Sequence, residues 1–305
     1  MKLAFATNAF TSGRYTLQDA MRVIAREGYE GVEILADQPL LWLPSVTVAE
    51  RLAIEKTLKH TDLKVSCVNG FTASGYYGDR KAPPGQQFGP SFSDSDPEMR
   101  KWRVWYTKLI VDFTRDVGGT DISISSGSPP TVDTTLRPIE RYIRRESAWR
   151  AMLEAIGDVV LYAKERRVNI NIEYEPGLFV GGEESAARIL NAIPDHNFGL
   201  NFDIGHSYVC GEDVISQIAR FKDRIHGVQV EDIGLNKETG ERLHYHLVPG
   251  EGVMPLGEIF ETFKEVGYAG WFTVELYNHF RHPVRVTRES RKRIKKIIKE
   301  IGGYE

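Results

Sequence analysis

The chain has 305 residues, of which 41% are hydrophobic and 27% are charged, and its formal net charge at pH 7 is −3. This weakly negative charge gives no general attraction to nucleic acid or to anionic lipid, so neither is expected as a partner. No apolar run approaches the roughly 18 residues of a membrane-spanning helix, and the first residues lack the features of a signal peptide, which together predict a cytoplasmic protein.

Short β-rich segments alternate with amphipathic segments along the whole chain. The expected strands are Leu3–Thr7, Gly31–Leu35, Lys64–Asn69, Asp121–Ser125, Val168–Glu173, Gly199–Asp203, Gly227–Val230 and Phe272–Leu276. The expected helices are Leu17–Glu27, Val48–Lys59, Glu98–Val117, Glu146–Arg166, Glu184–Ala192, Asp213–Phe221, Leu256–Val266 and Thr287–Ile301. Eight alternations predict an α/β fold, a closed (β/α)8 TIM barrel formed by residues 1–305 as a single domain, because an open doubly wound sheet usually has six strands.

Residues 72–95 interrupt this alternation with a segment rich in glycine and proline. Connections of this length in compact domains are usually functional lids or disordered segments. Four aromatic residues in the segment favour a lid: Tyr76, Tyr77, Phe88 and Phe92. We therefore expect a long loop over the active face of the barrel.

Polar side chains end four consecutive expected strands, where a TIM barrel places its active site. They are Glu173, Asp203, Gln229 and Glu275. Buried carboxylates require a counter-charge, and oxygen ligands suit Mg²⁺ or Mn²⁺ better than zinc, which normally has histidine or cysteine ligands. The pattern predicts one divalent ion, Mn²⁺ or Mg²⁺, with Co²⁺ as an alternative.

Four more residues are candidates for substrate binding on the same face. Glu175 points to the same side of its strand as Glu173, so spacing alone does not decide which of the two is the ligand. His206 follows three residues after Asp203, where the chain leaves its strand. His244 and His246 occupy alternate positions before a Pro-Gly-Glu-Gly turn, and they could bind a hydroxyl-rich ligand or, with His206, a second metal ion.

Several segments together resemble the xylose-isomerase-like superfamily of sugar isomerases and epimerases, including ketose 3-epimerases and the hydroxypyruvate-isomerase branch. They are Thr7-Asn-Ala-Phe10, Gly28-Tyr-Glu-Gly-Val-Glu33, Asn171-Ile-Glu173-x-Glu-Pro, Asp203-x-x-His206, Val228-Gln229-Val-Glu-Asp232, the Pro-Gly-Glu-Gly turn and Gly267-Tyr-Ala-Gly-x-x-x-Val-Glu275. The resemblance implies that Glu173 and Glu275 are metal ligands and also the catalytic acid/base pair, and that His206 and Asn8 contact substrate. Many members have histidine in place of Gln229, whereas the hydroxypyruvate-isomerase branch uses glutamine.

The implied reaction is proton transfer beside a carbonyl group of a sugar, sugar phosphate or keto sugar through an enediolate, giving isomerisation or epimerisation. Three alternatives remain: a lyase or dehydratase acting on a keto sugar or keto-glycoside with the same metal site, a non-catalytic sugar-binding barrel, and an endonuclease IV-like nuclease. The last is disfavoured because no histidine lies between His60 and His196 to build the early zinc ligands. The sequence leaves the identity of the sugar open, and also whether the protein forms a homo-oligomer.

Overall fold

A computed structural model describes residues 1–78, 80, 82–83 and 86–304. Eight parallel strands form a closed barrel in the order β1-β10-β7-β6-β5-β4-β3-β2, with β2 pairing back onto β1. These strands are β1 Lys2–Ala6, β2 Gly31–Leu35, β3 Lys64–Asn69, β4 Asp121–Ser125, β5 Asn169–Glu173, β6 Phe198–Asp203, β7 Ile225–Val230 and β10 Trp271–Val274. The predicted TIM barrel is confirmed, and the eight expected strands agree with the observed ones to within two residues at each end.

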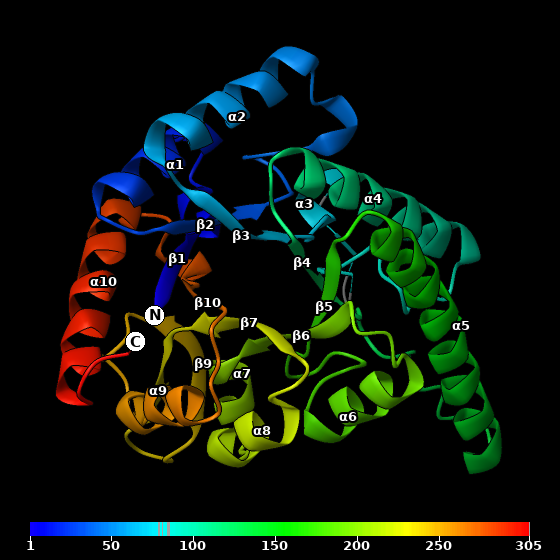
Figure 1. Cartoon of the computed structure of the whole chain (residues 1–305). Helices are drawn as coiled ribbons and strands as arrows, with labels where there is room; N and C mark the ends of the chain where they lie inside the picture. The colour runs from blue at the N-terminus through cyan, green and yellow to red at the C-terminus, as the bar shows by residue number, and fades with distance from the viewer. Residues whose placement is uncertain (79, 81, 84–85, 305) are drawn as a thin grey trace.

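Helices cover the outside of the barrel (Figure 1). They are α1 Leu17–Arg26, α2 Val48–Thr61, α4 Pro97–Asp116, α5 Pro138–Glu165, α6 Glu183–Ala192, α8 Val214–Phe221, α9 Leu256–Glu265 and α10 Pro283–Glu300. Local sequence explains where several of them begin. Thr16 and Thr47 each form a capping box with the acidic residue three positions later, which satisfies backbone N–H groups that the first turn leaves free. No helix among the described residues is long and apolar enough to cross a membrane.

Helix α5 begins at Pro138, eight residues before the expected start at Glu146. Its second half buries the predicted stripe, which includes Trp149, Met152, Ile156 and Val160. The first turns expose their apolar residues to solvent, so hydrophobic periodicity carried no sign of them. A proline at the first helical position, and the Glu140 carboxylate that accepts the backbone N–H of Arg137 at 2.9 Å, mark the true start.

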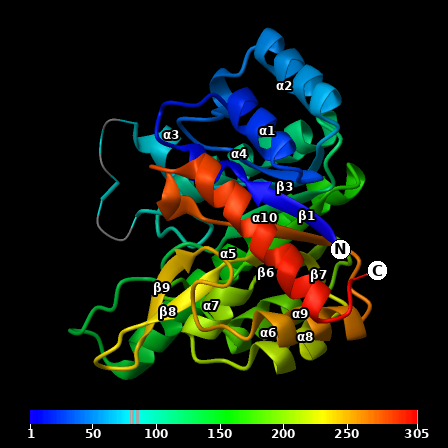
Figure 2. The same cartoon turned by 90° about the vertical axis from the view of Figure 1, so that its left-hand side faces the viewer.

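Two short helices and a two-stranded hairpin were absent from the expected set. Helix α3 (Ala73–Tyr77) lies within the long loop, α7 (Ile204–Val209) follows β6 directly, and β8 (Asp232–Leu235) pairs with β9 (Arg242–Leu247) in an antiparallel hairpin. Figure 2 shows α3 and the hairpin at one end of the barrel and both chain termini at the other. These additions therefore surround the carboxyl ends of the strands, and the hairpin carries His244 and His246.

The side chain of Asp37 attaches the beginning of the long loop to the barrel. The Asp37 carboxylate, just after β2, accepts backbone hydrogen bonds from Ser74 at 3.0 Å and Gly75 at 2.6 Å. Phe92, one of the four aromatic residues that favoured a lid, is instead fully buried, with the Arg103 guanidinium over its ring. Residues 79, 81, 84 and 85 of this segment lie outside the described residues.

Candidate metal centre and active site

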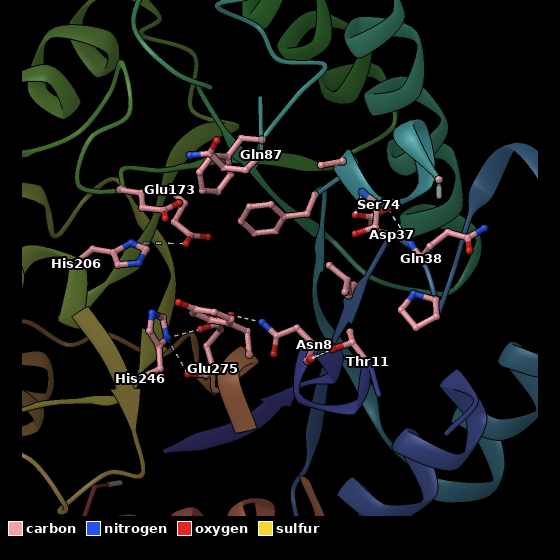
Figure 3. A pocket seen from close by; sticks show the side chains of 18 residues that line it. Asn8, Thr11, Asp37, Gln38, Ser74, Gln87, Glu173, His206, His246 and Glu275 are labelled. Carbon is pink, nitrogen blue, oxygen red and sulfur yellow. Dashed lines mark hydrogen bonds and ion pairs between the residues drawn. The ribbon is translucent and has the colours of Figure 1, made fainter. Parts of the chain in front are cut away.

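A cavity of about 690 Å³ opens at the carboxyl ends of the strands (Figure 3). Glu173, His206, His246 and Glu275 gather at one end of the cavity, and Asp37 with other loop residues lies at the opposite end. The lining also includes Asn8, Thr11, Leu35, Gln38, Pro39, Phe71, Ala73, Ser74, Gly78, Gln87, Phe88, Glu175 and Tyr277. No lysine or arginine is among these described lining residues, so the acidic side chains of the cavity outnumber its basic ones.

Glu173 ends β5 and points into the barrel. Its Oε2 atom accepts hydrogen bonds from Ser123 Oγ at 3.0 Å and Asn201 Nδ2 at 3.2 Å, while Oε1 lies 3.7 Å from the ring of His206. Burial, and then the neighbouring Asp203, raise the pKa of Glu173 well above its usual value. One oxygen of this carboxylate is thus held by the barrel and the other faces the cavity.

Asp203 ends β6 and caps the short helix α7. Its Oδ1 atom accepts the backbone N–H of His206 at 2.8 Å, and Oδ2 is buried without a hydrogen-bond partner. Burial alone would raise the pKa of Asp203, but the facing His206 helps to hold it below the usual value. A charged, buried oxygen without a partner is costly unless a cation binds it.

Gln229 on β7 is fully buried, and its amide has a defined direction. The Nε2 atom donates to Glu33 Oε1 at 3.0 Å, and Asn69 donates to the same oxygen at 3.2 Å. Because Nε2 is committed to Glu33, the Gln229 Oε1 atom points the other way, where it is buried and has no partner. This free carbonyl oxygen is what a metal ligand requires.

Glu275 follows β10 and is held from two sides. Asn8 Nδ2 donates to its Oε1 atom, and His246 Nδ1 lies 2.5 Å from its Oε2 atom. Burial opposes a charge on His246, but the Glu275 carboxylate raises the pKa of this histidine to about 9. The structure therefore brings Asn8, expected to contact substrate, into direct contact with a predicted catalytic residue.

Two buried acidic residues were not identified as site residues from the sequence. Glu33 on β2 holds Gln229, and burial followed by the charge of Glu275 raises its pKa to about 8. Glu231 is completely buried beside the carboxyl group of Asp203, and burial, followed by Asp203, raises its pKa well above the usual value. Glu231 was detectable in principle, because alternate residues of a strand share a face and it stands two positions after Gln229.

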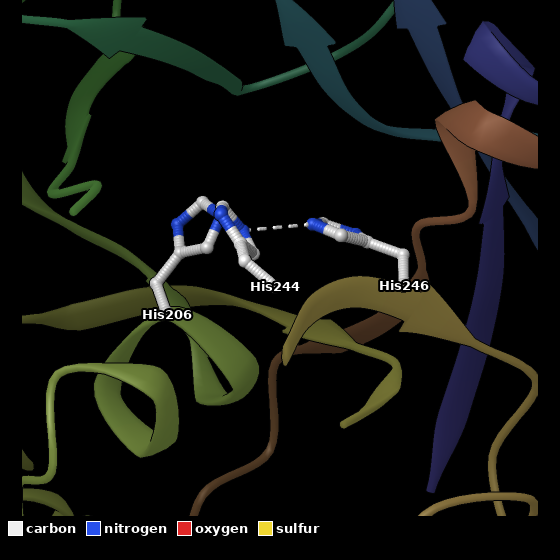
Figure 4. A group of neighbouring side chains, drawn as sticks. All are labelled: His206, His244 and His246. Carbon is white, nitrogen blue, oxygen red and sulfur yellow. Dashed lines mark hydrogen bonds between the residues drawn. The ribbon is translucent and has the colours of Figure 1, made fainter. Parts of the chain in front are cut away.

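Three groups of described residues have ligand atoms within 4.8 Å of one another. They are Glu173 with Asp203 and His206, Asp203 with Glu231 and His246, and His206 with His244 and His246. Asp203 and the histidines thus link the predicted oxygen site to the hairpin, although Glu275 belongs to none of the three groups. His206 and His246 line the cavity, whereas the neighbouring His244 is partly exposed and is not among the lining residues (Figure 4).

Comparisons with known proteins show the family of the chain. Residues 21–297 match the model of the family described as xylose isomerase-like TIM barrel. The fructoselysine 3-epimerase of Shigella flexneri is 23% identical over 96% of this chain and 98% of its own length. The inosose dehydratase of Geobacillus thermodenitrificans is 24% identical over 54% of this chain and 59% of its own length.

Among solved structures, the IOLI protein with a bound zinc atom superposes with a TM-score of 0.77 at 16% identity, and the alignment covers 99% of each chain. At that identity the superposition establishes the fold alone. The family match spans most of the chain, including every strand from β2 to β10. The protein therefore belongs to the xylose isomerase-like TIM barrel family.

Proposed function

We propose that this protein is a metal-dependent sugar isomerase or epimerase that moves a proton on a carbon beside a carbonyl group. The observation that carries the proposal is an acidic cavity lined by Glu173 after β5 and Glu275 after β10, with the buried side chains of Asp203 on β6 and Gln229 on β7 on the two strands between them. The functions of the relatives, a 3-epimerase and a dehydratase of inosose, support chemistry of this class.

The ligands proposed for one divalent ion are Glu173, Asp203, Gln229 and Glu275. Their fit rests on the unpartnered buried oxygens of Asp203 and Gln229 and on the absence of lysine or arginine from the described cavity lining. An oxygen-rich set favours Mn²⁺ or Mg²⁺, with Co²⁺ as an alternative. When bound, such an ion would polarise the carbonyl group and stabilise developing negative charge.

Glu173 and Glu275 are the proposed acid/base pair. Ser123 and Asn201 hold one oxygen of Glu173, whereas Asn8 and His246 each contact one oxygen of Glu275, and these contacts fix the direction of both carboxyl groups. A carboxylate positioned in this way typically contributes 10²–10⁴-fold as a general base. With one glutamate removing the proton, the other can return it to the opposite face or to the adjoining carbon.

The proposed substrate is a sugar or keto sugar. The cavity is of the size that small ligands occupy. Asn8 and Glu175 line it and can contact hydroxyl groups, and the histidines reach the substrate either directly or through a second ion. The second candidate is a dehydratase, favoured by the inosose dehydratase relative, which would begin with the same proton removal and then lose a hydroxyl group.

Solvent exchange tests this function directly. The metal-loaded protein should exchange a carbon-bound proton for deuterium when it is incubated in D₂O with a panel of ketoses, ketose phosphates and keto sugars. Elimination products would identify the dehydratase. Protein stripped by a chelator is the control and should be inactive until Mn²⁺, Mg²⁺ or Co²⁺ is restored. If no compound in the panel undergoes exchange or elimination, and the purified protein also retains no divalent ion, the proposed function is wrong. The protein would then be a non-catalytic barrel.

Replacement of Gln229 by histidine should preserve metal binding but change metal preference. The imidazole nitrogen is a softer ligand than the amide oxygen, so the ratio of Zn²⁺ to Mn²⁺ affinity should rise by about tenfold or more. Competition titrations with the two ions measure the ratio, and Asn69→Ala is the matched control because Asn69 contacts Glu33 without contacting Gln229. An unchanged ratio would place Gln229 outside the ligand set.

A further inference from the structure

A second cavity, of about 570 Å³, adjoins the first near the carboxyl end of β4. Phe88 is half-buried and lines both cavities, Gln87 lines the first and Gln86 lines the second, so this short segment forms the wall between them. The rest of the second lining comes from the end of the long loop, the start of α4, the connection after β4 and the first half of α5. A ligand in the first cavity therefore has room to extend past Phe88 into the second.

Hydrogen bonds hold the walls of the second cavity together. Ser93 donates its backbone N–H to the Ser126 carbonyl at 3.0 Å and its hydroxyl to the Ser128 carbonyl at 2.7 Å. Gly127 has a φ of +87°, and a Cβ atom there would collide with the side chain of Ser91, so only glycine lets the two segments come this close. The folded chain therefore forms this cavity by itself, before any ligand binds.

The second cavity also accounts for the early start of α5. The buried side chains of this helix begin at Trp149, so packing against the barrel does not explain the turns that precede the predicted start at Glu146. Arg144 belongs to those turns and lines the second cavity. Its guanidinium is only loosely paired, 3.8 Å from the carboxylate of Asp133, and is mostly exposed. The extra turns thus supply a wall of the cavity and a positive charge.

Two groups of opposite charge in this cavity each keep polar atoms free. The Asp94 side chain is 8% exposed, its Oδ1 atom accepts the backbone N–H of Asp96 at 3.2 Å, and its Oδ2 atom is buried without a partner. Arg100 donates through Nη1 to the backbone carbonyls of Asp94 and Ser95, at 2.6 and 3.2 Å. Among the described residues no carboxylate pairs with Arg100, so its charge is left for a ligand.

Charge distinguishes the two cavities. The described lining of the first has no lysine or arginine and has the carboxyl groups of Asp37, Glu173, Glu175 and Glu275. The described lining of the second has Arg100 and Arg144 with a single carboxyl group, that of Asp94. An anionic group of a ligand is therefore better placed in the second cavity. Planar guanidinium groups match a carboxylate, and the free oxygen of Asp94 requires a hydrogen-bond donor beside it.

We infer that the substrate is a conjugate, with its reacting sugar in the first cavity and an attached group in the second that carries a carboxylate beside a hydrogen-bond donor. Arg100 and Arg144 receive the carboxylate, and Asp94 accepts from the donor. A sugar acid, with its hydroxyl groups, and an amino acid, with its ammonium group, share this chemistry. The inference rests on the proposed function for the reacting sugar and adds the class of the group attached to it.

Binding of free and conjugated ketoses tests this inference without measuring turnover. Isothermal titration calorimetry on the full-length protein, saturated with Mn²⁺, compares fructose, the neutral disaccharide glucosylfructose, glucuronosylfructose and fructosylglycine. We expect at least one of the two charged conjugates to bind about tenfold or more tightly than glucosylfructose, because hydrogen bonds between charged groups are the strong ones. The conjugate with the larger gain identifies the attached group as a sugar acid or an amino acid.

Substitutions in the second cavity locate the gain. Arg100→Met and Arg144→Met should each bring the affinity of the charged conjugate close to that of glucosylfructose. Arg144 is exposed, so its variant keeps the test valid even if the loop requires Arg100 in order to fold. Asp94→Asn keeps an acceptor but loses a charge, so it should weaken fructosylglycine more than glucuronosylfructose. Arg115→Met is the matched control, because Arg115 is exposed at the other end of α4 and pairs with Asp116.

Two results would overturn the inference and leave the proposed function standing. One is equal affinity for the charged conjugates and for glucosylfructose, and the other is an advantage that survives both arginine variants. Binding of none of the four probes would overturn it as well. The proposed function is decided separately, by deuterium exchange into the panel of free ketoses, so the two failures are distinguishable.

Discussion

Glu275→Gln should abolish turnover and solvent exchange at the substrate carbon, with a loss of at least about 10²-fold. The amide still offers an oxygen to a metal and a carbonyl to Asn8, but it cannot accept a proton. Asn8 and His246 would still surround the side chain, so the variant should fold as the wild type does. The exchange rate in D₂O, measured on the substrate identified from the panel, gives the size of the loss.

The control for this variant is Glu251→Gln, a partly exposed glutamate that pairs with Arg293 outside the cavity. Bound metal is measured in both proteins, so that a loss of ion is not mistaken for a loss of the base. If Glu275→Gln keeps more than roughly a tenth of the activity, Glu275 is a ligand only. The base would then have to be sought at Glu175 or His206, which line the same cavity.

Removal of metal should make the stability of the protein fall as pH rises. Burial, assisted by Glu275 and by Asp203 respectively, raises the pKa values of Glu33 and Glu175 from 4.5 to about 8. In the unfolded chain these groups ionise near pH 4.5, whereas in the folded, metal-free protein they stay protonated until about pH 8. The stability that they provide is therefore complete below about pH 4.5 and is lost progressively up to about pH 8.

The loss should be on the order of several kcal/mol in the free energy of unfolding, because one pKa unit corresponds to about 1.4 kcal/mol. Bound metal should reverse the trend, since cations compete with protons for carboxylates and bind more tightly as pH rises. Urea unfolding at pH 5, 6, 7 and 8, with a chelator or with excess Mn²⁺, measures how the free energy of unfolding changes with pH in each condition. Glu33→Gln should flatten the metal-free slope. Equal slopes with and without metal would mean that these carboxyl groups do not face an ion.

Much of the fold was readable from the sequence because its signals are local. Strand and helix periodicity, together with glycine-rich breaks, gave the eight alternations, and the barrel closes as predicted. The same pattern placed Glu173, Asp203, Gln229 and Glu275 near the carboxyl ends of their strands. The start of α5 and the β8–β9 hairpin were missed, because an exposed helical turn and a strand of mixed polarity lack a hydrophobic period.

The partners of the site residues depended on closure of the barrel, which joins segments far apart in the chain. Gln229 meets Glu33 across 196 positions and Glu275 meets Asn8 across 267. The direction of the Gln229 amide, which leaves its buried oxygen without a partner, follows from the first of these contacts. Sequence alone thus indicated most of the chemical groups at the mouth of the barrel, but not the buried Glu33 and Glu231. Tertiary structure decided which of their atoms are already occupied and which remain free, because each pairing is set by strands that neighbour one another only in the folded barrel.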